Sequence, residues 1–313
     1  MRILVLGGTG FVGRHVCEQL VRVGHRVTVP TRRASRAAPV QTLPGLTVLE
    51  SDVHNEAALQ GLMAGHDAVV NLIAVLHGSE ARFEQVHVQL PQALARAMHK
   101  AGVRRLVHVS ALGADAQGPS RYQRSKARGE AVLRESGLEL TLLRPSVIFG
   151  ADDRFLNLFA DLQKFFPFMP LAGSRTRFQP VWVVDVARAV LRCLQDRQTI
   201  GQTYEACGPD VLTLGELVQR AGQWAGVQHG RGRAVIPLPR WVGWLQALAM
   251  EMAPGEPLMS RDNLASMQVD NVASGSLPGL QALGIQPAAL AGIAPGYLGP
   301  RSRLDAWRAQ GRR

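Results

Sequence analysis

A tyrosine and a lysine four residues apart are the side chains in this sequence best suited to acid–base chemistry. Residues 122–126 read YQRSK within a helical pattern, so Tyr122 and Lys126 share one helix face. A neighbouring ammonium favours phenolate and should lower the pKa of the tyrosine from about 10 toward neutrality. Ser110, at the end of a strand-like run, can donate a hydrogen bond to a substrate oxygen. We therefore predict Tyr122, Lys126 and Ser110 as catalytic residues, with a chemically silent helix-surface pair as the alternative.

Glycines near the amino terminus form a phosphate-binding pattern. Directly after a strand-like run, residues 7–13 read GGTGFVG, and a helical pattern follows. Glycine permits the tight turn, the close approach of a pyrophosphate to the main chain and the packing of the helix on the sheet. The free N–H groups and positive dipole end of the helix attract phosphates. A P-loop is excluded because no Gly-Lys-Ser/Thr follows. We expect a dinucleotide to contact Gly7, Thr9, Gly10, Phe11, Val12 and Gly13.

The end of the second strand-like run indicates which dinucleotide binds. An NAD site usually carries an acidic residue about 20 residues beyond the glycines, whereas this chain has Thr31, Arg32 and Arg33. Guanidinium groups suit the 2′-phosphate of NADP because they form bidentate, charge-assisted hydrogen bonds. The sequence therefore favours NADP(H), with NAD(H) and an ordinary basic loop as the alternative.

Two further strand ends complete the expected cofactor site. Asp52 and Val53 follow the third run, where a carboxylate can accept a hydrogen bond from the adenine amino group. Asn71, Leu72 and Ile73 close the fourth run, beside the expected ribose. Asp52 could instead cap a helix, and Asn71 could serve only as a turn residue.

Apolar runs alternate with amphipathic segments through the first half of the chain, and this order positions these residues. Strand-like runs lie at 3–6, 27–29, 46–49, 68–74, 106–109 and 138–143, and the clearest helical patterns at 13–23, 81–101 and 121–135. The alternation predicts an α/β fold with a doubly wound parallel sheet covered on both faces.

The rhythm changes after residue 145, where frequent prolines break the chain into short helices and extended pieces. We predict a dinucleotide-binding domain at 1–150 and a smaller substrate or partner subdomain at 151–298. Within the latter, residues 181–194 should return to the main sheet as strand and helix. Residues 299–313 form a basic tail.

Composition excludes several other kinds of site. The three cysteines form no CxxC pair, and the nine histidines form no HExxH motif, so no metal site and no disulfide framework are predicted. No GxSxG nucleophile turn occurs. The net charge of +11 suits cofactor phosphates, anionic lipids or an acidic partner, or is merely a solvated surface. No nucleic-acid motif accompanies it.

The sequence predicts a cytoplasmic protein, because no signal peptide is visible. Residues 239–250 form a mostly apolar helix with two tryptophans and a basic start, a composition found at lipid boundaries. Peripheral contact with an anionic membrane, on the inner face of the cytoplasmic membrane, would follow. The alternative is a buried lid over the cofactor.

In their order, these motifs resemble an atypical short-chain dehydrogenase/reductase of the extended type. The glycine turn and YQRSK are joined by VHVS at 107–110, LRPSVIFG at 143–150 and VWVVDVA at 181–187. Within the family, the chain is similar to the NADPH-binding accessory subunits of respiratory complex I and their bacterial relatives. The supporting segments are SALGAD at 110–115, SRY at 120–122, KARGE at 126–130, DRFLN at 153–157 and DNV at 270–272.

The resemblance covers residues 1–298. It implies that Pro145 also contacts the cofactor and that Tyr122 and Lys126 bind the nicotinamide ribose. It implies retained cofactor binding with an incomplete catalytic set. His87 stands where extended members commonly carry asparagine, and Ser110 is followed by Ala111.

Three functions are open, of which the resemblance favours the first and the intact Tyr122 and Lys126 support the second. The first is an NADP(H)-binding protein with a structural, sensing or assembly role at respiratory complex I or a quinone-related system, with weak or no turnover. The second is an active NADP-dependent oxidoreductase or epimerase/dehydratase that acts on a small carbonyl or hydroxyl compound through Tyr122 and Lys126. The third is a nucleotide sensor that docks on a partner protein.

Overall fold

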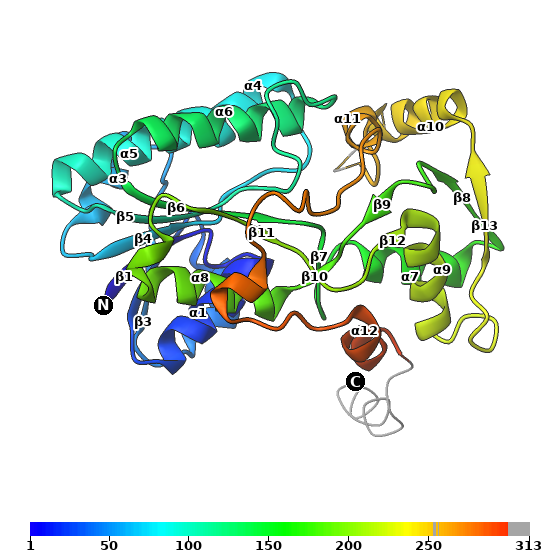
Figure 1. The fold of residues 1–313 in the computed structure, drawn as a ribbon, viewed down its shortest axis with the longest axis horizontal. Helices are drawn as coiled ribbons and strands as arrows, with labels where there is room; N and C mark the ends of the chain where they lie inside the picture. The colour runs from blue at the N-terminus through cyan, green and yellow to red at the C-terminus, as the bar shows by residue number, and fades with distance from the viewer. Residues whose placement is uncertain (253–254, 256, 300–313) are drawn as a thin grey trace.

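A seven-stranded parallel sheet forms the centre of the molecule (Figure 1). The computed structural model describes residues 1–252, 255 and 257–299, so the predicted tail lies outside the described residues except for Gly299. Across the sheet, the strands are β11 (Thr203–Ala206), β6 (Glu139–Pro145), β5 (Arg105–Val109), β4 (Ala68–Asn71), β1 (Arg2–Leu6), β2 (Arg26–Thr31) and β3 (Leu46–Glu50). Every neighbouring pair is parallel. The predicted doubly wound parallel sheet is thereby confirmed.

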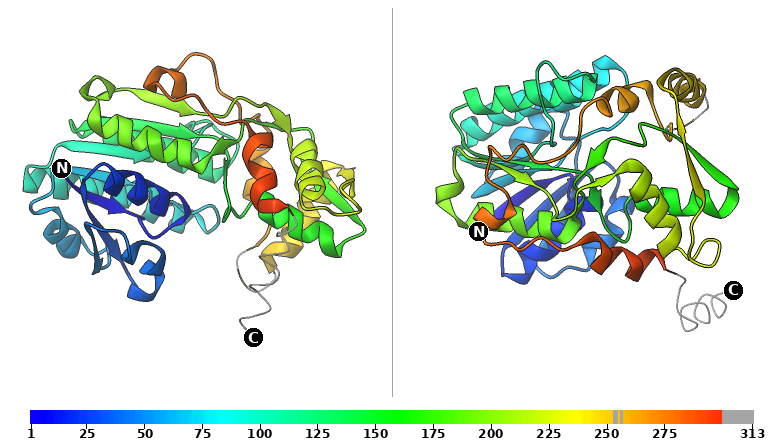
Figure 2. Two further views of the ribbon diagram at one scale, coloured as in Figure 1. Left: turned by 90° about the horizontal axis from the view of Figure 1, so that it is seen from below. Right: turned by 45° about the vertical axis from the view of Figure 1, so that its right-hand side comes forward.

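Helices cover both faces of this sheet (Figures 1 and 2). One face carries α1 (Phe11–Arg22), the short α2 (Ala38–Gln41) and α8 (Val183–Gln195). The other carries α3 (Glu56–Met63), α5 (Leu90–Ala101) and α6 (Arg121–Glu135). Helix α4 (Glu80–Glu84) leads into α5 through one π-helical turn, Gln85–Gln89.

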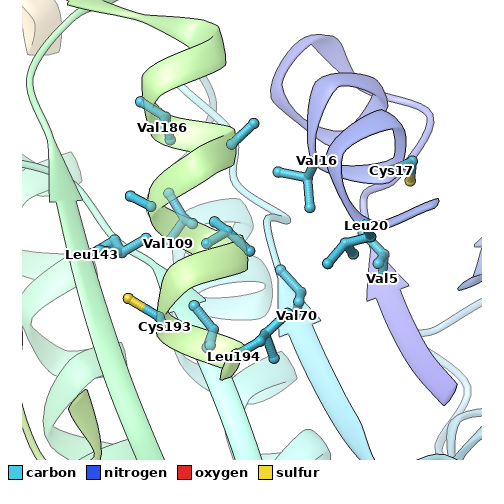
Figure 3. Close-up of a cluster of buried hydrophobic side chains, with 14 of the residues drawn as sticks. Val5, Val16, Cys17, Leu20, Val70, Val109, Leu143, Val186, Cys193 and Leu194 are labelled. Carbon is cyan, nitrogen blue, oxygen red and sulfur yellow. The ribbon is translucent and has the colours of Figure 1, made fainter. Parts of the chain in front are cut away.

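The core between the sheet and helices α1 and α8 is tightly packed and apolar (Figure 3). Strand β1 sends Ile3 and Val5 into this core, while Leu4 and Leu6 enter the core on the opposite face. A strand that is buried on both faces reads as a continuous apolar run, which explains the sequence RILVL. The two cores hold the carboxyl edge of the sheet as a fixed platform.

A second lobe lies beyond that carboxyl edge, on the right of Figure 1. Its helices are α7 (Leu156–Phe165), α9 (Leu214–Trp224), α10 (Arg240–Met252), α11 (Arg261–Ser266) and α12 (Leu290–Leu298). Its strand pairs are the parallel β8 (Phe168–Ala172) with β13 (Ala234–Leu238) and the antiparallel β9 (Arg177–Phe178) with β12 (Leu212–Thr213).

The segment 181–194 connects the two parts of the fold. Helix α8 packs against α1, β5 and β6, whereas β10 (Val181–Trp182) pairs with β7 (Ile148–Phe149) outside the seven-stranded sheet. The seventh strand of the main sheet is β11, which pairs with β6 in parallel.

Candidate functional site

The glycine turn between β1 and α1 leaves no room for side chains. Gly7 has a φ of +84°, a left-handed conformation, and its carbonyl oxygen accepts a 3.0 Å hydrogen bond from the Gly10 N–H. A Cβ on Gly13 would lie 2.1 Å from the Gly7 carbonyl oxygen and 2.6 Å from the Gly8 Cα. In the described chain, the first turn of α1 has no side-chain cap and no acidic residue. Its N–H groups and positive dipole end are therefore free to bind a pyrophosphate. Thr9, Phe11 and Val12 are half-buried along this turn.

The end of β4 packs against this turn. A Cβ on Gly7 would lie 3.3 Å from the Ile73 side chain and from the Leu72 carbonyl carbon. The buried Asn71 side chain accepts a hydrogen bond from the Ile73 N–H (3.1 Å), and its amide nitrogen lies 3.1 Å from His108 Nδ1. Asn71 therefore shapes the strand end through bonds within the protein, while Leu72 and Ile73 lie beside the glycines.

Ser110 follows the end of β5, and Lys126 binds the carbonyl oxygen of the residue before it. The Ser110 hydroxyl is buried and has no hydrogen-bond partner among the described residues. Lys126 is almost completely buried, and its Nζ donates to the Val109 carbonyl oxygen at 3.3 Å. Burial lowers the pKa of Lys126 to about 8, against the opposing charge of Glu130. A buried polar atom without a partner is costly, so an unsatisfied hydroxyl here fits a ligand that supplies the missing bond. Pro145 is buried at the end of β6, where its carbonyl oxygen accepts from the Leu112 N–H (2.9 Å).

Tyr122 has apolar aromatic neighbours. Its ring meets His87 edge-on at 5.6 Å and Phe83 at 6.2 Å between ring centroids. Burial raises the pKa of Tyr122 to about 12. This is opposite to the direction expected from the spacing of Tyr122 and Lys126. The reason is that the phenol is desolvated, while the Lys126 ammonium is directed to the Val109 carbonyl.

His87 is held in one neutral form. Its Nε2 accepts from the Val75 N–H (3.2 Å), so Nδ1 carries the proton and donates to Ser125 Oγ (2.8 Å). Ser125 in turn donates to the Tyr122 carbonyl oxygen at 2.8 Å. Burial, followed by the charge of Lys126, lowers the pKa of His87 to about 3. His87 thus links the loop after β4 to α6 and does not gain a proton near neutral pH.

The π-helical turn that carries His87 touches α6 directly. A Cβ on Gly129 would lie 1.9 Å from the His87 carbonyl oxygen. Such π-turns occur frequently at functional sites, and only glycine permits this approach. The glycine in KARGE therefore has a packing role that sets the distance between the π-turn and the Tyr122 helix.

The second lobe contributes one residue to the start of that helix. The buried Asp262 of α11 accepts from the N–H groups of Arg121 (2.8 Å) and Tyr122 (3.0 Å). An aspartate at this position complements the dipole of α6. Sequence reasoning missed Asp262, because a partner 140 residues away leaves no signal in local spacing.

The basic residues after β2 have no ion-pair partner among the described residues. Arg32 and Arg33 are exposed, and Thr31 closes their turn, because its Oγ1 donates to the Arg33 carbonyl oxygen at 3.1 Å. Burial lowers the pKa of His54. The negative charge of Asp52 raises this pKa in part, and the positive charges of Arg82 and Arg32 lower it further.

The site around His54 therefore includes side chains from two loops and from helix α4. Asp52 accepts from the His54 N–H (3.0 Å), whereas Val53 is buried in the core beneath α3. His54 and Arg82 were absent from the sequence-based site, because neither lies at a strand end that the motif specifies.

The carboxyl ends of parallel strands therefore gather a side-chain-free phosphate turn, unpaired guanidinium groups, an unsatisfied serine hydroxyl and a buried lysine. These features define a Rossmann protein that binds NAD(P), built like a short-chain dehydrogenase/reductase. A bound nicotinamide would supply hydride transfer, and the chain's own groups would orient it. Among the described residues, no group of three or more His, Cys, Asp or Glu side chains could hold a metal ion.

Similarity to known proteins supports the assignment to the NAD(P)-binding Rossmann proteins. Residues 7–197 match the NAD(P)H-binding family. Over 301 residues, the chain is 36% identical to the mouse (Mus musculus) mitochondrial protein "NADH dehydrogenase (ubiquinone) 1 alpha subcomplex subunit 9", with 91% of this chain and 76% of the mouse protein aligned. It is 29% identical over 298 residues to the 40 kDa subunit of NADH-ubiquinone oxidoreductase from Neurospora crassa, covering 94% of this chain and 78% of that subunit.

A solved structure shares the fold. The dTDP-glucose 4,6-dehydratase of Streptomyces venezuelae, with NAD and TYD bound, superposes with a TM-score of 0.75 at 23% identity, covering 95% of this chain and 96% of that one. This chain belongs to the NAD(P)H-binding family, and within it to the family of the alpha subcomplex subunit 9 proteins.

Proposed function

We propose that this protein holds NADPH as a resident ligand and has a structural, sensing or assembly role at respiratory complex I or a quinone-related system, with weak or no turnover. The observation that carries the proposal is the state of the Tyr122 and His87 pair. Burial raises the pKa of the Tyr122 phenol to about 12, and both ring nitrogens of His87 are engaged in hydrogen bonds within the protein. A raised phenol pKa disfavours proton transfer at neutral pH, while the open phosphate turn and the buried Lys126 support a role in binding. The relatives named as complex I subunits support the same role.

The preference for NADPH over NADH rests on charge around His54. Arg32 follows β2 and Arg82 lies in helix α4, and the positive charge of each lowers the pKa of His54. Arg32 has no ion-pair partner among the described residues, and the Arg82 guanidinium donates to the neutral Gln85 side chain (2.7 Å). A dianionic 2′-phosphate would neutralise this pair with charge-assisted hydrogen bonds.

A second function is favoured by Ser110. Its unsatisfied hydroxyl and the buried Lys126 beside it would suit an active oxidoreductase or epimerase/dehydratase with a small carbonyl or hydroxyl substrate.

One experiment separates these two functions. The purified protein is denatured, the released nucleotide is identified by mass spectrometry, and NADPH absorbance is followed with a panel of carbonyl compounds. Resident NADPH without oxidation supports the binding role. Oxidation that disappears in Tyr122→Phe would establish the enzyme instead.

We also propose peripheral contact between α10 and an anionic membrane, which would place the protein on the inner face of the cytoplasmic membrane. None of the described helices is both long and apolar enough to cross a bilayer. Helix α10 packs its small residues inward, because a Cβ on Gly243 would lie 2.4 Å from the Ala172 Cβ. Its large side chains face outward, with Trp241 69% and Trp244 45% exposed, which disfavours a buried lid. Arg240 supplies a positive charge at the start of the helix.

Flotation with vesicles that contain phosphatidylglycerol tests this contact. We expect the protein to float with these vesicles and to lose flotation when Trp241 and Trp244 are both changed to serine. Protein that stays in the soluble fraction contradicts membrane contact and leaves α10 as a surface for a protein partner.

A further inference from the structure

A second candidate binding site lies at the amino edge of the sheet, opposite the glycine turn. It is a cavity of about 580 Å³ formed by the first residues of β1, β2 and β3 and by the turn before β4. The polar residues that line it are Arg2, Arg26, Thr28, Thr47 and His66. None of the residues that the dinucleotide motif specifies lines this cavity.

Two positive charges face each other in this cavity. Arg2 and Arg26 are direct register partners in β1 and β2, and both are exposed. Among the described residues, no carboxylate forms an ion pair with either guanidinium group. The Asp67 carboxylate is bound to the Arg2 backbone N–H at 2.7 Å instead. Like charges at facing positions of a sheet repel, weakly where both are exposed to water, and an anion bound between them would remove this repulsion.

His66 adds a polar atom that lacks a partner. Its Nε2 lies 2.8 Å from Thr28 Oγ1, while its Nδ1 is buried and makes no hydrogen bond within the described chain. When Thr28 donates to Nε2, Nδ1 carries a proton that it can donate. His66 lines the cavity, so a turn of its ring that brings Nδ1 to the cavity surface would let a ligand oxygen accept this proton.

We propose that this cavity binds a phosphate-bearing small molecule, separately from the dinucleotide. Guanidinium groups bind phosphate through paired, charge-assisted hydrogen bonds, and His66 and Thr47 offer further donors. The volume lies within the range of small-molecule sites, roughly 300–1,000 Å³. Apart from the His66 imidazole, the lining has no aromatic ring, so recognition depends on the phosphate rather than on a stacked base.

Calorimetry with pyrophosphate tests the proposal on protein saturated with NADPH, which keeps the glycine turn occupied. At constant ionic strength, we expect saturable binding that weakens about tenfold or more in Arg2→Gln and in Arg26→Gln, because each loses a charge-assisted pair. Arg175→Gln is the matched control, since Arg175 is exposed in the second lobe and does not line the cavity. Its affinity should equal that of the unchanged protein.

Absence of saturable binding would overturn the proposal, as would equal affinity in the two cavity variants and the control. Binding seen only without NADPH would also overturn it, because pyrophosphate would then be occupying the glycine turn. A parallel titration with AMP identifies the source of the phosphate. Tighter binding of AMP than of pyrophosphate indicates that the ligand is a nucleotide, and weaker binding indicates that the phosphate groups alone are recognised. With either ligand, Arg2→Gln and Arg26→Gln should weaken binding by the same factor.

Discussion

Adding one methyl group to the glycine turn should weaken dinucleotide binding strongly. In Gly13→Ala, the new Cβ would lie 2.1 Å from the Gly7 carbonyl oxygen, whereas an ordinary contact is about 3.5 Å. The start of α1 must therefore move by roughly 1.4 Å, enough to break hydrogen bonds between its N–H groups and a pyrophosphate. Two lost charge-assisted bonds correspond to an affinity for NADPH reduced about 100-fold. Overpacking of about 3 kcal/mol should lower the melting temperature by roughly 6 °C.

A graded series of alanine substitutions makes this test specific. A Cβ on Gly10 would lie 3.2 Å from the Gly7 carbonyl oxygen, so the losses of NADPH affinity and melting temperature in Gly10→Ala should be smaller than in Gly13→Ala. A Cβ on Gly61, within α3, meets nothing within 4 Å, so Gly61→Ala should bind normally and melt at the same or a slightly higher temperature. Titration calorimetry and thermal melts measure both effects. Normal NADPH affinity in Gly13→Ala would show that the pyrophosphate binds away from the glycine turn.

Three further predictions concern the Tyr122 helix. Asp262→Asn should lower the free energy of unfolding by about 1.5 kcal/mol, measured by chemical denaturation, because the group that binds the first N–H groups of α6 loses its charge. An unchanged denaturation midpoint would show that the second lobe does not stabilise this helix. His87 has a pKa of about 3 when folded and an ordinary value when unfolded, so the unfolded chain binds the extra proton and stability falls as pH drops below about 6.5. His87→Asn should therefore show a smaller loss of melting temperature between pH 7 and pH 5.5, and an equal loss would contradict a neutral, buried His87. Gly129→Ala should weaken NADPH binding and lower the melting temperature, because its Cβ would lie 1.9 Å from the His87 carbonyl oxygen. Unchanged NADPH affinity and melting temperature in this variant would show that the π-turn and α6 are free to separate.

The parts of the fold that local chemistry dictates could be predicted from sequence. The strand and helix that flank the glycine turn were predicted because apolar periodicity and glycine geometry act over a few residues. The helix Arg121–Glu135 was predicted with its observed bounds, and the Ser120 capping box explains its sharp start. Strand β11 was missed, since Thr203–Ala206 is short and becomes a strand only by pairing with β6.

The electrostatics of the site could not be predicted from spacing. A four-residue interval places Tyr122 and Lys126 on one helix face, but it does not indicate how far each is buried. Burial raises the pKa of Tyr122 and lowers that of Lys126. Asp262 and Arg82 reach the site from distant segments, so only the folded chain brings them there.

We propose that the glycine turn holds the diphosphate of NADPH while Arg32 binds its 2′-phosphate. Calorimetric titration of NADPH and NADH into the unchanged protein and into Arg32→Gln tests both contacts. We predict that NADPH binds the unchanged protein at least about tenfold more tightly than NADH, and that Arg32→Gln loses this advantage without weakening NADH. Equal affinities for the two nucleotides in the unchanged protein would contradict the claim.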